Sequence, residues 1–312
     1  MTVANEYPDV DRVTAFLKQL QIQCCDRFQE FNPELPFHQD RWTYETGGGG
    51  ITRMIENGQV FEKGGVNFSN IKGNSLPDAA TASREHIAGK PFAATGVSVV
   101  MHPLNPFVPS AHMNVRFFIV DPESSDPVWW FGGGYDLTPY YGFAEDCKHW
   151  HQTAKSACDK FAPDIYDKFK AQCDQYFFIK HRNEPRGIGG LFFDDFNELG
   201  FTESFSLMQS VGNSFLDAYM PIVEKRRQMK YNDANRRYQC YRRGRYVEFN
   251  LIYDRGTIFG LQSAGRTESI LMSMPPAVEW RYNWQPQPGS DEENLIRYYL
   301  KPRDWARDWA RE

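Results

Sequence analysis

The chain has 312 residues, of which 41% are hydrophobic, 24% charged and 15% aromatic, so it is long enough to bury a sizeable core. Its 35 lysines and arginines and 40 aspartates and glutamates give a net charge of −5, which argues against a nucleic-acid-binding protein with a strongly basic surface. No apolar run approaches the roughly 18 residues of a membrane-spanning helix, and no signal-peptide pattern is visible at the N-terminus. We therefore expect a soluble, cytoplasmic protein.

The first half of the chain is predicted to be rich in strands. Apolar residues at helical spacing predict a helix over 8–31. Strands are then predicted over 51–71, 96–101, 112–120 and 128–137, and three prolines keep the connection between the second and third of them extended.

The second half is predicted to be mainly helical. Helices are expected over roughly 142–176 and 197–240, on either side of a short strand at 187–195. Residues 245–263 are predicted to form a β-hairpin around an Asp-Arg-Gly turn, and the tail from residue 291 a charged amphipathic helix. Strands in adjacent runs and helices in blocks favour an α+β fold with an antiparallel sheet packed against helices.

The strand predicted over 112–120 has two unlike faces. Alternate side chains are wholly apolar and should belong to the core, namely Met113, Val115, Phe117 and Ile119. The other face carries His112, Asn114 and Arg116 in a row. A solvated face would explain them, but such strands usually bear Lys, Glu and Thr, so we favour a cleft.

The neighbouring predicted strand places Ser98 and His102 on one of its faces. If the two strands pair, these side chains line the same pocket as the polar residues of the strand 112–120. The alternative is a serine and a histidine that are satisfied by local hydrogen bonds at the end of a strand.

A run of three glycines, 132–134, precedes Asp136. Glycines inside a strand often mark a place where a ligand or another backbone comes close, so Asp136 is a candidate functional residue, although it could also simply open the following turn. No G-K-[ST] sequence follows this run, which therefore is not a phosphate-binding loop.

Arginines are frequent at positions where a solvated charge would be unusual, such as Arg186 and Arg266. Because the arginine fork suits carboxylates, several convergent arginines on an acidic protein suggest a polyanionic small substrate. For Arg242 and Arg243 we prefer the alternative that they are charges near a helix C-terminus.

Compact metal-binding motifs are missing from the sequence. Its six cysteines form no C-x-x-C pair, which predicts free thiols and argues against a radical-type iron–sulfur cluster. Its seven histidines show neither the H-x-D nor the H-E-x-x-H spacing, so a standard facial-triad oxygenase and a zincin are not indicated. The sequence alone does not decide whether histidines far apart in the chain assemble a metal site.

Taken together, these motifs closely resemble the oxygen-dependent coproporphyrinogen-III oxidase family over almost the whole chain. The segments that carry the resemblance are 48–53, 96–102, 112–118, 129–139, 181–195 and 243–276. The resemblance implies a single domain over residues 1–312, in which a large flat antiparallel sheet is sandwiched between layers of helices, and a homodimer.

The implied reaction is the oxidative decarboxylation of two propionates of coproporphyrinogen III to vinyl groups, which gives protoporphyrinogen IX in haem and chlorophyll biosynthesis. Molecular oxygen is the implied co-substrate and no organic cofactor is implied. The tetra-carboxylate substrate agrees with the arginines noted above.

The resemblance also implies roles for individual residues. The substrate-binding positions are Ser98, Asn114, Val115, Arg116, Arg186, Ala264, Gly265 and Arg266. His112 matches the proton donor and Asp136 the acidic residue that organises the pyrrole nitrogens. A divalent metal is implied by positions that match ligands in bacterial members, whereas other members are described as metal-free; these positions are His102, His112, His151 and His181. Family members often have Gly at position 264, and residues 246–280 resemble the region linked to dimerisation.

Two other classes of protein compete with this interpretation. A tetrapyrrole carrier would use the same arginines and aromatic residues but would not need Asp136. A metal-dependent oxygenase of another family would need a tight histidine–carboxylate spacing, which is missing. The oxygen-independent enzyme for the same step is excluded by the cysteine spacing.

Overall fold

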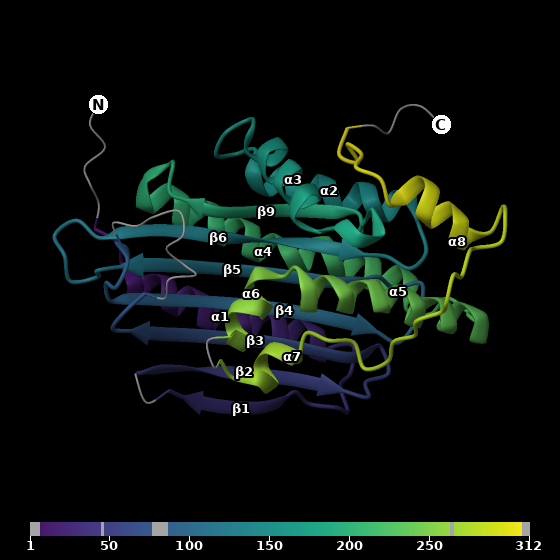
Figure 1. The fold of residues 1–312 in the computed structure, drawn as a ribbon, viewed down its shortest axis with the longest axis horizontal. Helices are drawn as coiled ribbons and strands as arrows, with labels where there is room; N and C mark the ends of the chain where they lie inside the picture. Colours follow the sequence, from purple (N-terminus) through teal and green to yellow (C-terminus); the bar gives the residue numbers. More distant parts are fainter. Residues whose placement is uncertain (1–6, 45–46, 77–86, 263–264, 308–312) are drawn as a thin grey trace.

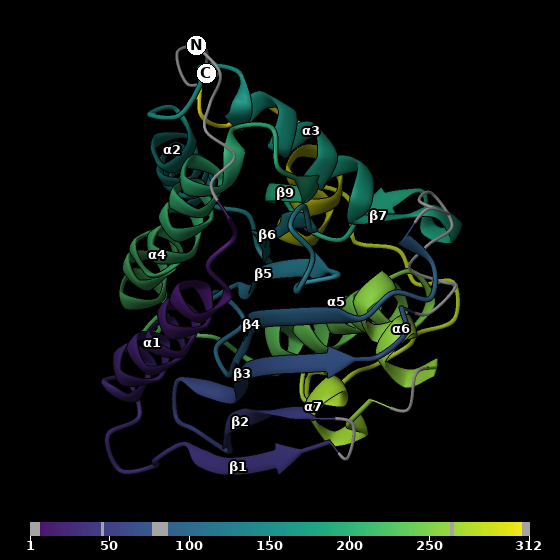
Figure 2. The ribbon, with the colours of Figure 1, turned by 90° about the vertical axis from the view of Figure 1, so that its left-hand side faces the viewer.

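The computed structural model, which describes residues 7–44, 47–76, 87–262 and 265–307, has a seven-stranded antiparallel sheet with helices on both faces (Figures 1 and 2). The strands of this sheet lie in the order β1-β2-β3-β4-β5-β6-β9, so the first six are neighbours both in sequence and in space. The α+β class predicted from the sequence is confirmed.

The strand bounds are as follows. The main sheet consists of β1 (His38–Thr43), β2 (Gly48–Glu56), β3 (Phe61–Gly73), β4 (Phe92–Pro103), β5 (Ser110–Val120), β6 (Val128–Thr138) and β9 (Gly189–Phe196). A small second sheet pairs β7 (Phe178–Ile179) with β8 (Glu184–Pro185) around the 3-10 turn η3 (Lys180–Arg182). The predicted strand-like segment 51–71 comprises most of β2 and β3.

One face of the sheet is covered by α1 (Val10–Gln29) and α4 (Gly200–Arg226), with α2 (Ala144–Cys158) beside α4 (Figure 2). The main hydrophobic core lies here, and side chains of β5 and β6 pack against aromatic rings of α4. Phe117 meets Phe201 edge-on with ring centroids 5.9 Å apart, and Phe131 stacks on Phe205 at 6.0 Å. Burial of such aromatic surface stabilises this layer.

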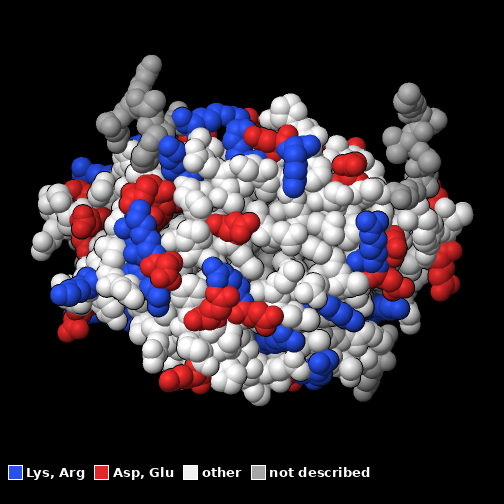
Figure 3. Space-filling model, turned by 180° about the vertical axis from the view of Figure 1, so that it is seen from behind, with Lys and Arg blue, Asp and Glu red and all other residues white. Residues whose placement is uncertain are grey.

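The outer surface of this helical layer carries acidic and basic side chains interspersed with one another (Figure 3). Within α4, Pro221 has no N–H to donate to the carbonyl of Asp217 one turn earlier. His149 of α2 donates to that carbonyl instead, at 3.0 Å. A residue of the neighbouring helix thus satisfies the acceptor that the proline leaves open.

The opposite face of the sheet lies beneath α5 (Asp233–Ile252), α6 (Arg255–Gln262) and α7 (Thr267–Leu271) (Figure 2). Polar contacts fasten this layer to the strands. The hydroxyls of Thr52 on β2 and Ser269 on α7 share a hydrogen bond of 2.7 Å. The side chains of α3 (Ile165–Tyr176) pack on the edge strand β9. The last helical elements of the described residues are α8 (Asp291–Asn294) and a π-helical turn, η4 (Leu295–Tyr299).

The β-hairpin predicted over residues 245–263 is wrong, because residues 245–252 continue α5 and residues 255–262 form α6. In a strand Phe249 and Leu251 would share one face, but in α5 Phe249 is buried and Leu251 is exposed. The buried stripe of α5 instead includes Arg242 and Arg245, whose charges are paired with acids. The supposed turn is the start of α6, where the carboxylate of Asp254 accepts from the Thr257 N–H at 2.7 Å.

Two further predictions need smaller corrections. The helical stretch predicted over 142–176 is two helices, and Pro163 lies in the break between α2 and α3. Over residues 291–307, the described part of the predicted C-terminal helix, only one short α-helical segment and the π-helical turn over 295–299 form. In the part of the chain that the structure describes, no helix is long and apolar enough to cross a membrane.

Candidate functional site

The predicted polar pocket lies on the sheet face beneath α5–α7. Strand pairing places Ser98 of β4 directly opposite Asn114 of β5, and His112 of β5 opposite Asp136 of β6. Arg116 follows two residues after Asn114 and therefore shares its face. The structure thus brings together five of the six polar side chains that the sequence predicted for this pocket. The sixth, His102, is on β4 two turns of the alternation from Ser98 but is fully buried.

The centre of this face is a chain of three side chains. His112 donates through Nδ1 to Oδ1 of Asp136 at 2.9 Å, and Arg186 donates through Nη2 to both oxygens of Asp136 at 2.8 Å. Asp136 and Arg186 are only 1% and 2% exposed, whereas the imidazole of His112 is 22% exposed. His112 is therefore the member of the chain that solvent and ligands reach.

The electrostatics of the buried pair follow from this geometry. Burial alone would raise the pKa of Asp136, but the charge of Arg186 and the hydrogen bond from His112 outweigh it, so the pKa lies below its ordinary value. Burial would lower the pKa of Arg186, but the charge of Asp136 raises it above its ordinary value. Both groups are therefore charged at neutral pH.

Arg186 is enclosed by aromatic rings. Its guanidinium carbon lies 4.3 Å from the ring centre of Phe177 and 4.4 Å from that of Tyr246, and its Nη1 donates to Oδ1 of Asn250 at 2.6 Å. An arginine held in this way stays in place but presents little surface to a substrate. It acts on the site through Asp136.

Asp136 in turn fixes the imidazole of His112. Because Nδ1 donates to a buried carboxylate, Nε2 is the ring atom that can take up or release a proton toward the polar face. A histidine oriented by a buried carboxylate is a common arrangement for general acid–base chemistry.

Arg116 provides a cation beside this histidine. It donates to Oδ1 of Asn114 and to Oδ1 of Asp194 on β9, both at 2.8 Å. Its guanidinium lies across Gly132, where a Cβ atom would be 3.0 Å from the guanidinium carbon and 2.8 Å from Asp194. The first glycine of the run therefore makes room for a protein cation, which explains why that position lacks a side chain.

Arg266 lies at the other end of the polar face. Its guanidinium pairs with Asp40 on β1, and its backbone N–H donates to the hydroxyl of Tyr44 at 3.0 Å. The backbone N–H of Gly265 donates to the carbonyl of Gly260 at 2.8 Å. Ala264 lies outside the described residues. Of the predicted substrate-binding loop 264–266, the structure therefore places the charged side chain of Arg266 on the polar face.

Val115 is not brought to the site. Its side chain is buried on the opposite face of the sheet, in the core beside α4. Its backbone is paired between Val97 and Gly133 in the middle of the sheet. The side chain therefore contributes to the packing that supports the site.

The four histidines implied as metal ligands have separate surroundings. His102 donates through Nε2 to the carbonyl of Ser273 and accepts at Nδ1 from Ser110, both at 2.8 Å. His151 donates to the carbonyl of Ile188 and accepts from Tyr166, both at 3.0 Å. Burial and nearby positive charges lower the pKa of His151 to about 3 and that of His102 well below its ordinary value, so both rings are neutral.

Neither of these two buried rings offers a lone pair to a metal, because each Nδ1 already accepts a hydrogen bond. His181 contacts Glu248 at 2.7 Å and Tyr253 at 2.8 Å, and His112 contacts Asp136. Over residues 7–44, 47–76, 87–262 and 265–307, no group of three or more His, Cys, Asp and Glu side chains could hold a metal ion. These residues therefore do not fit a resident metal.

Two other arginines noted in the sequence form ion pairs inside the protein. Arg242 pairs with Glu184 at 3.0 Å and Arg243 with Glu62 at 2.7 Å. The proposed helix C-terminal position of Arg242 and Arg243 is wrong, because both are buried in the middle of α5. They connect α5 to distant segments of the chain.

Sequence reasoning missed Asp194 and Asn250, which orient Arg116 and Arg186. Asp194 lies in the predicted strand 187–195, where alternation places its charged side chain on the same face as the aromatic Phe192. A carboxylate next to an aromatic residue on one face of a strand is unusual, and this signal could have identified Asp194. Asn250 had no comparable signal, because its segment was assigned to a strand and not to the helix that faces Arg186.

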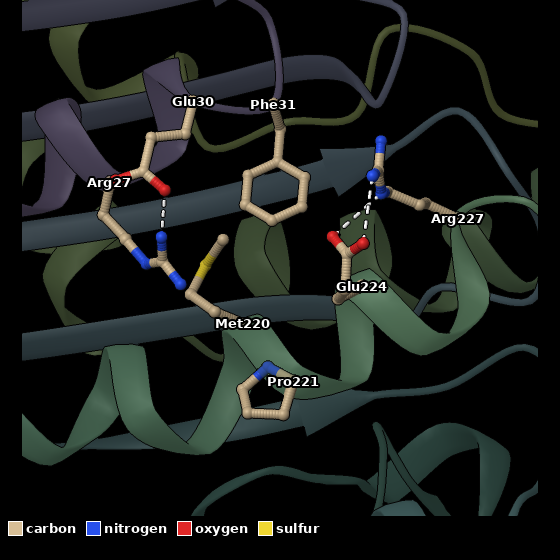
Figure 4. A pocket seen from close by; sticks show the side chains of 7 residues that line it. All are labelled: Arg27, Glu30, Phe31, Met220, Pro221, Glu224 and Arg227. Atoms are coloured by element: carbon tan, nitrogen blue, oxygen red, sulfur yellow. Dashed lines mark hydrogen bonds and ion pairs between the residues drawn. The ribbon is translucent and has the colours of Figure 1, made fainter.

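A surface groove lies elsewhere, between the end of α1 and the last turns of α4 (Figure 4). Met220 and Phe31 line it, and its two arginines are paired with glutamates: Arg27 with Glu30, and Arg227 with Glu224 at 3.0 Å. This groove is on the side of the sheet opposite the polar face and contains none of the predicted site residues.

An acid–base histidine on a buried carboxylate, with one arginine beside it and another at the far end of the same sheet face, suits an α+β enzyme that acts on an anionic substrate. The family comparison is more specific: the family model described as coproporphyrinogen III oxidase matches residues 12–305. The chain belongs to the coproporphyrinogen III oxidase family, whose members are oxidoreductases of porphyrin biosynthesis, and coproporphyrinogen III is the substrate that this family implies.

Proposed function

We propose that the protein is an oxygen-dependent coproporphyrinogen oxidase that converts two propionates of its substrate to vinyl groups and yields protoporphyrinogen IX. Each propionate loses carbon dioxide, one proton and two electrons. The four electrons, with these two protons and two more from solvent, reduce one molecule of oxygen to two molecules of water. The observation that carries the proposal is the chain His112–Asp136–Arg186 beside Arg116, on a polar face whose far end, at β1, carries Arg266.

The spacing of these arginines suits a tetrapyrrole. Asp40, which holds Arg266, lies on β1, and Arg116 lies on β5, four strands away. At the usual spacing of about 4.8 Å between strands this corresponds to roughly 19 Å. Each arginine can bind a propionate at the rim of the macrocycle through charge-assisted hydrogen bonds, each of which contributes roughly 1.5–3 kcal/mol.

In this proposal His112 is the catalytic residue that transfers protons at Nε2, and Asp136 is a positioning residue. A role of Asp136 in organising the pyrrole nitrogens would require a pyrrole N–H to replace the His112 ring, because both carboxylate oxygens are occupied and the side chain is 1% exposed. Ser98 and Asn114 add hydrogen-bonding groups on the same face.

The oxygen dependence is tested by incubating the protein with coproporphyrinogen III under aerobic and anaerobic conditions and measuring product fluorescence after oxidation. Turnover only with oxygen, accompanied by oxygen uptake, is expected. Turnover without oxygen would contradict the proposal, and binding without oxygen uptake would favour a tetrapyrrole carrier. Activity is also expected to survive treatment with a strong chelator.

We also propose a cytoplasmic homodimer. The outer side of the α5–α6 region exposes the apolar side chains of Leu251, Ile252 and Leu261, which lie in the segment 246–280. Pairing of this surface with a second copy would remove apolar area from water. Light scattering should give about twice the chain mass of 36.2 kDa, and a monomer at micromolar concentration would contradict the proposal.

A further inference from the structure

One row of polar side chains crosses the sheet between the two arginines of the polar face. Its members lie directly opposite one another on neighbouring strands and therefore share a face: Asp40, Thr52, Asn67, Ser98 and Asn114. The ends of the row hold Arg266, through Asp40, and Arg116, through Asn114. A substrate that reaches both arginines therefore passes over the middle of the row.

Asn67 is the middle member of this row. It lies on β3, two strands from Asp40 on β1 and two strands from Asn114 on β5. At the usual spacing of about 4.8 Å between strands, each of these separations is roughly 10 Å. The side chain of Asn67 is half-buried, as is that of Ser98 directly opposite, so both keep some surface that a ligand can reach.

The hydrogen bonds of Thr52 fix the direction of the Asn67 amide. The hydroxyl of Thr52 has one hydrogen, which it donates to Oδ1 of Asn67 at 2.8 Å, and it accepts from Nε1 of Trp42 at 3.0 Å. In its hydrogen bond of 2.7 Å with Ser269, the hydroxyl of Ser269 is therefore the donor. Asn67 thus turns its oxygen toward β2 and keeps Nδ2, with two N–H donors, for another partner.

Two hydrogen-bond donors in the middle of the row are unused within the described part of the chain, namely Nδ2 of Asn67 and the hydroxyl of Ser98. Coproporphyrinogen offers them only one kind of acceptor, because its pyrrole nitrogens all carry hydrogens and its other substituents are methyl groups. That acceptor is the carboxylate of a propionate. Arg116 and Arg266 cannot bind every propionate of this tetra-carboxylate substrate, so further donors are needed.

We propose, on the basis of the oxidase function above, that Asn67 is a further substrate-binding residue. Its Nδ2 and the hydroxyl of Ser98 donate to one propionate carboxylate that lies between those bound by Arg116 and Arg266. Because both donors are neutral, this carboxylate is held by directed hydrogen bonds without a protein cation. The hydrogen bond from Thr52 presents the donors before the substrate arrives, which lowers the entropy cost of binding.

Asn67→Asp is the decisive variant, because aspartate keeps an oxygen that accepts from Thr52 but has a charged acceptor in place of the N–H donors. Asn67→Ala removes the donors without adding charge. Asn70→Asp is the matched control, because it makes the same change on β3 at a position that alternation places on the opposite face of the sheet.

Each variant is compared with the parent in three measurements. Binding is measured with oxidised coproporphyrin III, which is fluorescent and does not undergo the reaction. KM and kcat are measured with coproporphyrinogen III, and stability is measured by urea unfolding.

Asn67→Asp is expected to weaken coproporphyrin binding and raise KM at least about tenfold, because a hydrogen bond to a charged group is lost and a like charge faces the carboxylate. The unfolding midpoint should stay close to that of the parent, because the hydrogen bond from Thr52 is kept. Asn67→Ala should weaken binding about five- to tenfold. Asn70→Asp should bind within about twofold of the parent, which accounts for the added negative charge.

Equal or tighter binding by Asn67→Asp would overturn the proposal, because the amide would then serve only as an acceptor. An equal loss in Asn70→Asp would also overturn it, because the effect would then be one of overall charge. If the parent binds coproporphyrin and Asn67→Asp does not, but the parent consumes no oxygen, the oxidase proposal fails and the role of Asn67 stands. If the parent and Asn67→Asp turn over with the same KM, the role of Asn67 fails and the oxidase proposal stands.

Discussion

On β5, successive side chains point toward two very different environments. Toward α4, Val115 and Phe117 are buried among apolar and aromatic residues. Toward α5, His112 and Arg116 meet carboxylates and amides and keep part of their surface accessible. One strand therefore serves both the core and the site, and the comparison teaches that substitutions on the two faces should have separable effects on stability and on activity.

The largest effect is expected for Asp136→Asn. Loss of the charge that orients His112 should reduce turnover at least about a hundredfold, the low end for a general acid–base group. It also leaves Arg186 buried without its ion-pair partner, which should lower the free energy of unfolding by about 3–5 kcal/mol. Turnover is measured at saturating substrate and stability by urea unfolding.

Asp146→Asn is the matched control on the other side of the sheet. Asp146 is a buried carboxylate of α2 paired with Arg226 at 2.8 Å, and the guanidinium of Arg226 lies 3.7 Å from the ring centre of Phe143. A smaller loss of stability with normal turnover is expected, because Arg226 keeps Glu145 as a second partner at 2.6 Å. If Asp136→Asn kept turnover within a few-fold of the parent, the role of Asp136 in positioning His112 would be refuted.

Phe215→Ala tests the apolar face alone. Phe215 of α4 is fully buried against Tyr135 and Trp150, with ring centroids 5.9 and 6.2 Å away. The lost contacts and the cavity should lower the free energy of unfolding by about 3–5 kcal/mol. KM and kcat should be unchanged at temperatures where the variant is folded. A large change in KM would show that the two faces are coupled.

Glu248→Gln tests how far the polar side depends on ion pairs for its stability. Burial alone would raise the pKa of Glu248, but hydrogen bonds from Arg182, His181 and Trp280 and the charge of Arg245 lower it from 4.5 to about 2. Because the folded-state pKa is depressed, this stabilisation is present above about pH 4.5 and is lost as the pH falls toward 2.

The variant should lose about 2–3 kcal/mol at pH 7, because hydrogen bonds between charged groups each contribute roughly 1.5–3 kcal/mol. Its free energy of unfolding should then vary less between pH 4.5 and 2 than that of the parent, which urea titrations at several pH values measure. Phe215→Ala should retain the pH dependence of the parent. Equal slopes in the parent and Glu248→Gln would contradict this account.

The smallest effect is expected for Gly132→Ala. The new Cβ would meet Asp194 at 2.8 Å and the guanidinium of Arg116 at 3.0 Å, so Arg116 must shift. We expect a rise in KM of about threefold, near 0.7 kcal/mol, with little change in stability.

Gly212→Ala provides the comparison on the apolar face, where the Cβ would meet the end of the flexible Leu20 side chain at 2.9 Å. The better helix propensity of alanine, about 1 kcal/mol, should offset much of that crowding, and KM should not change. A larger rise in KM for Gly212→Ala than for Gly132→Ala would contradict the assignment of substrate binding to the polar face and of the core to the face packed against α4.

The sequence was sufficient to predict the sheet and the polar face because both depend on a local alternation of apolar and polar residues in β4 and β5. It was not sufficient for α5, because hydropathy treats Arg242 and Arg243 as surface residues, whereas their acids, Glu184 and Glu62, lie far away in the chain. For the same reason the sequence could not show that Arg186 forms a buried ion pair with Asp136, which lies 50 residues earlier in the chain.

The contacts that fasten α5–α7 to the strands have a consequence for the order of folding. Arg243 bonds to a residue 181 positions earlier, Thr52 to a residue 217 positions later, and Arg266 to a residue 226 positions earlier. Contacts of such sequence separation form slowly, because a long loop must close first. During synthesis β1–β6 emerge well before α7, so the polar face is first exposed and becomes a binding site only when nearly the whole chain has been made.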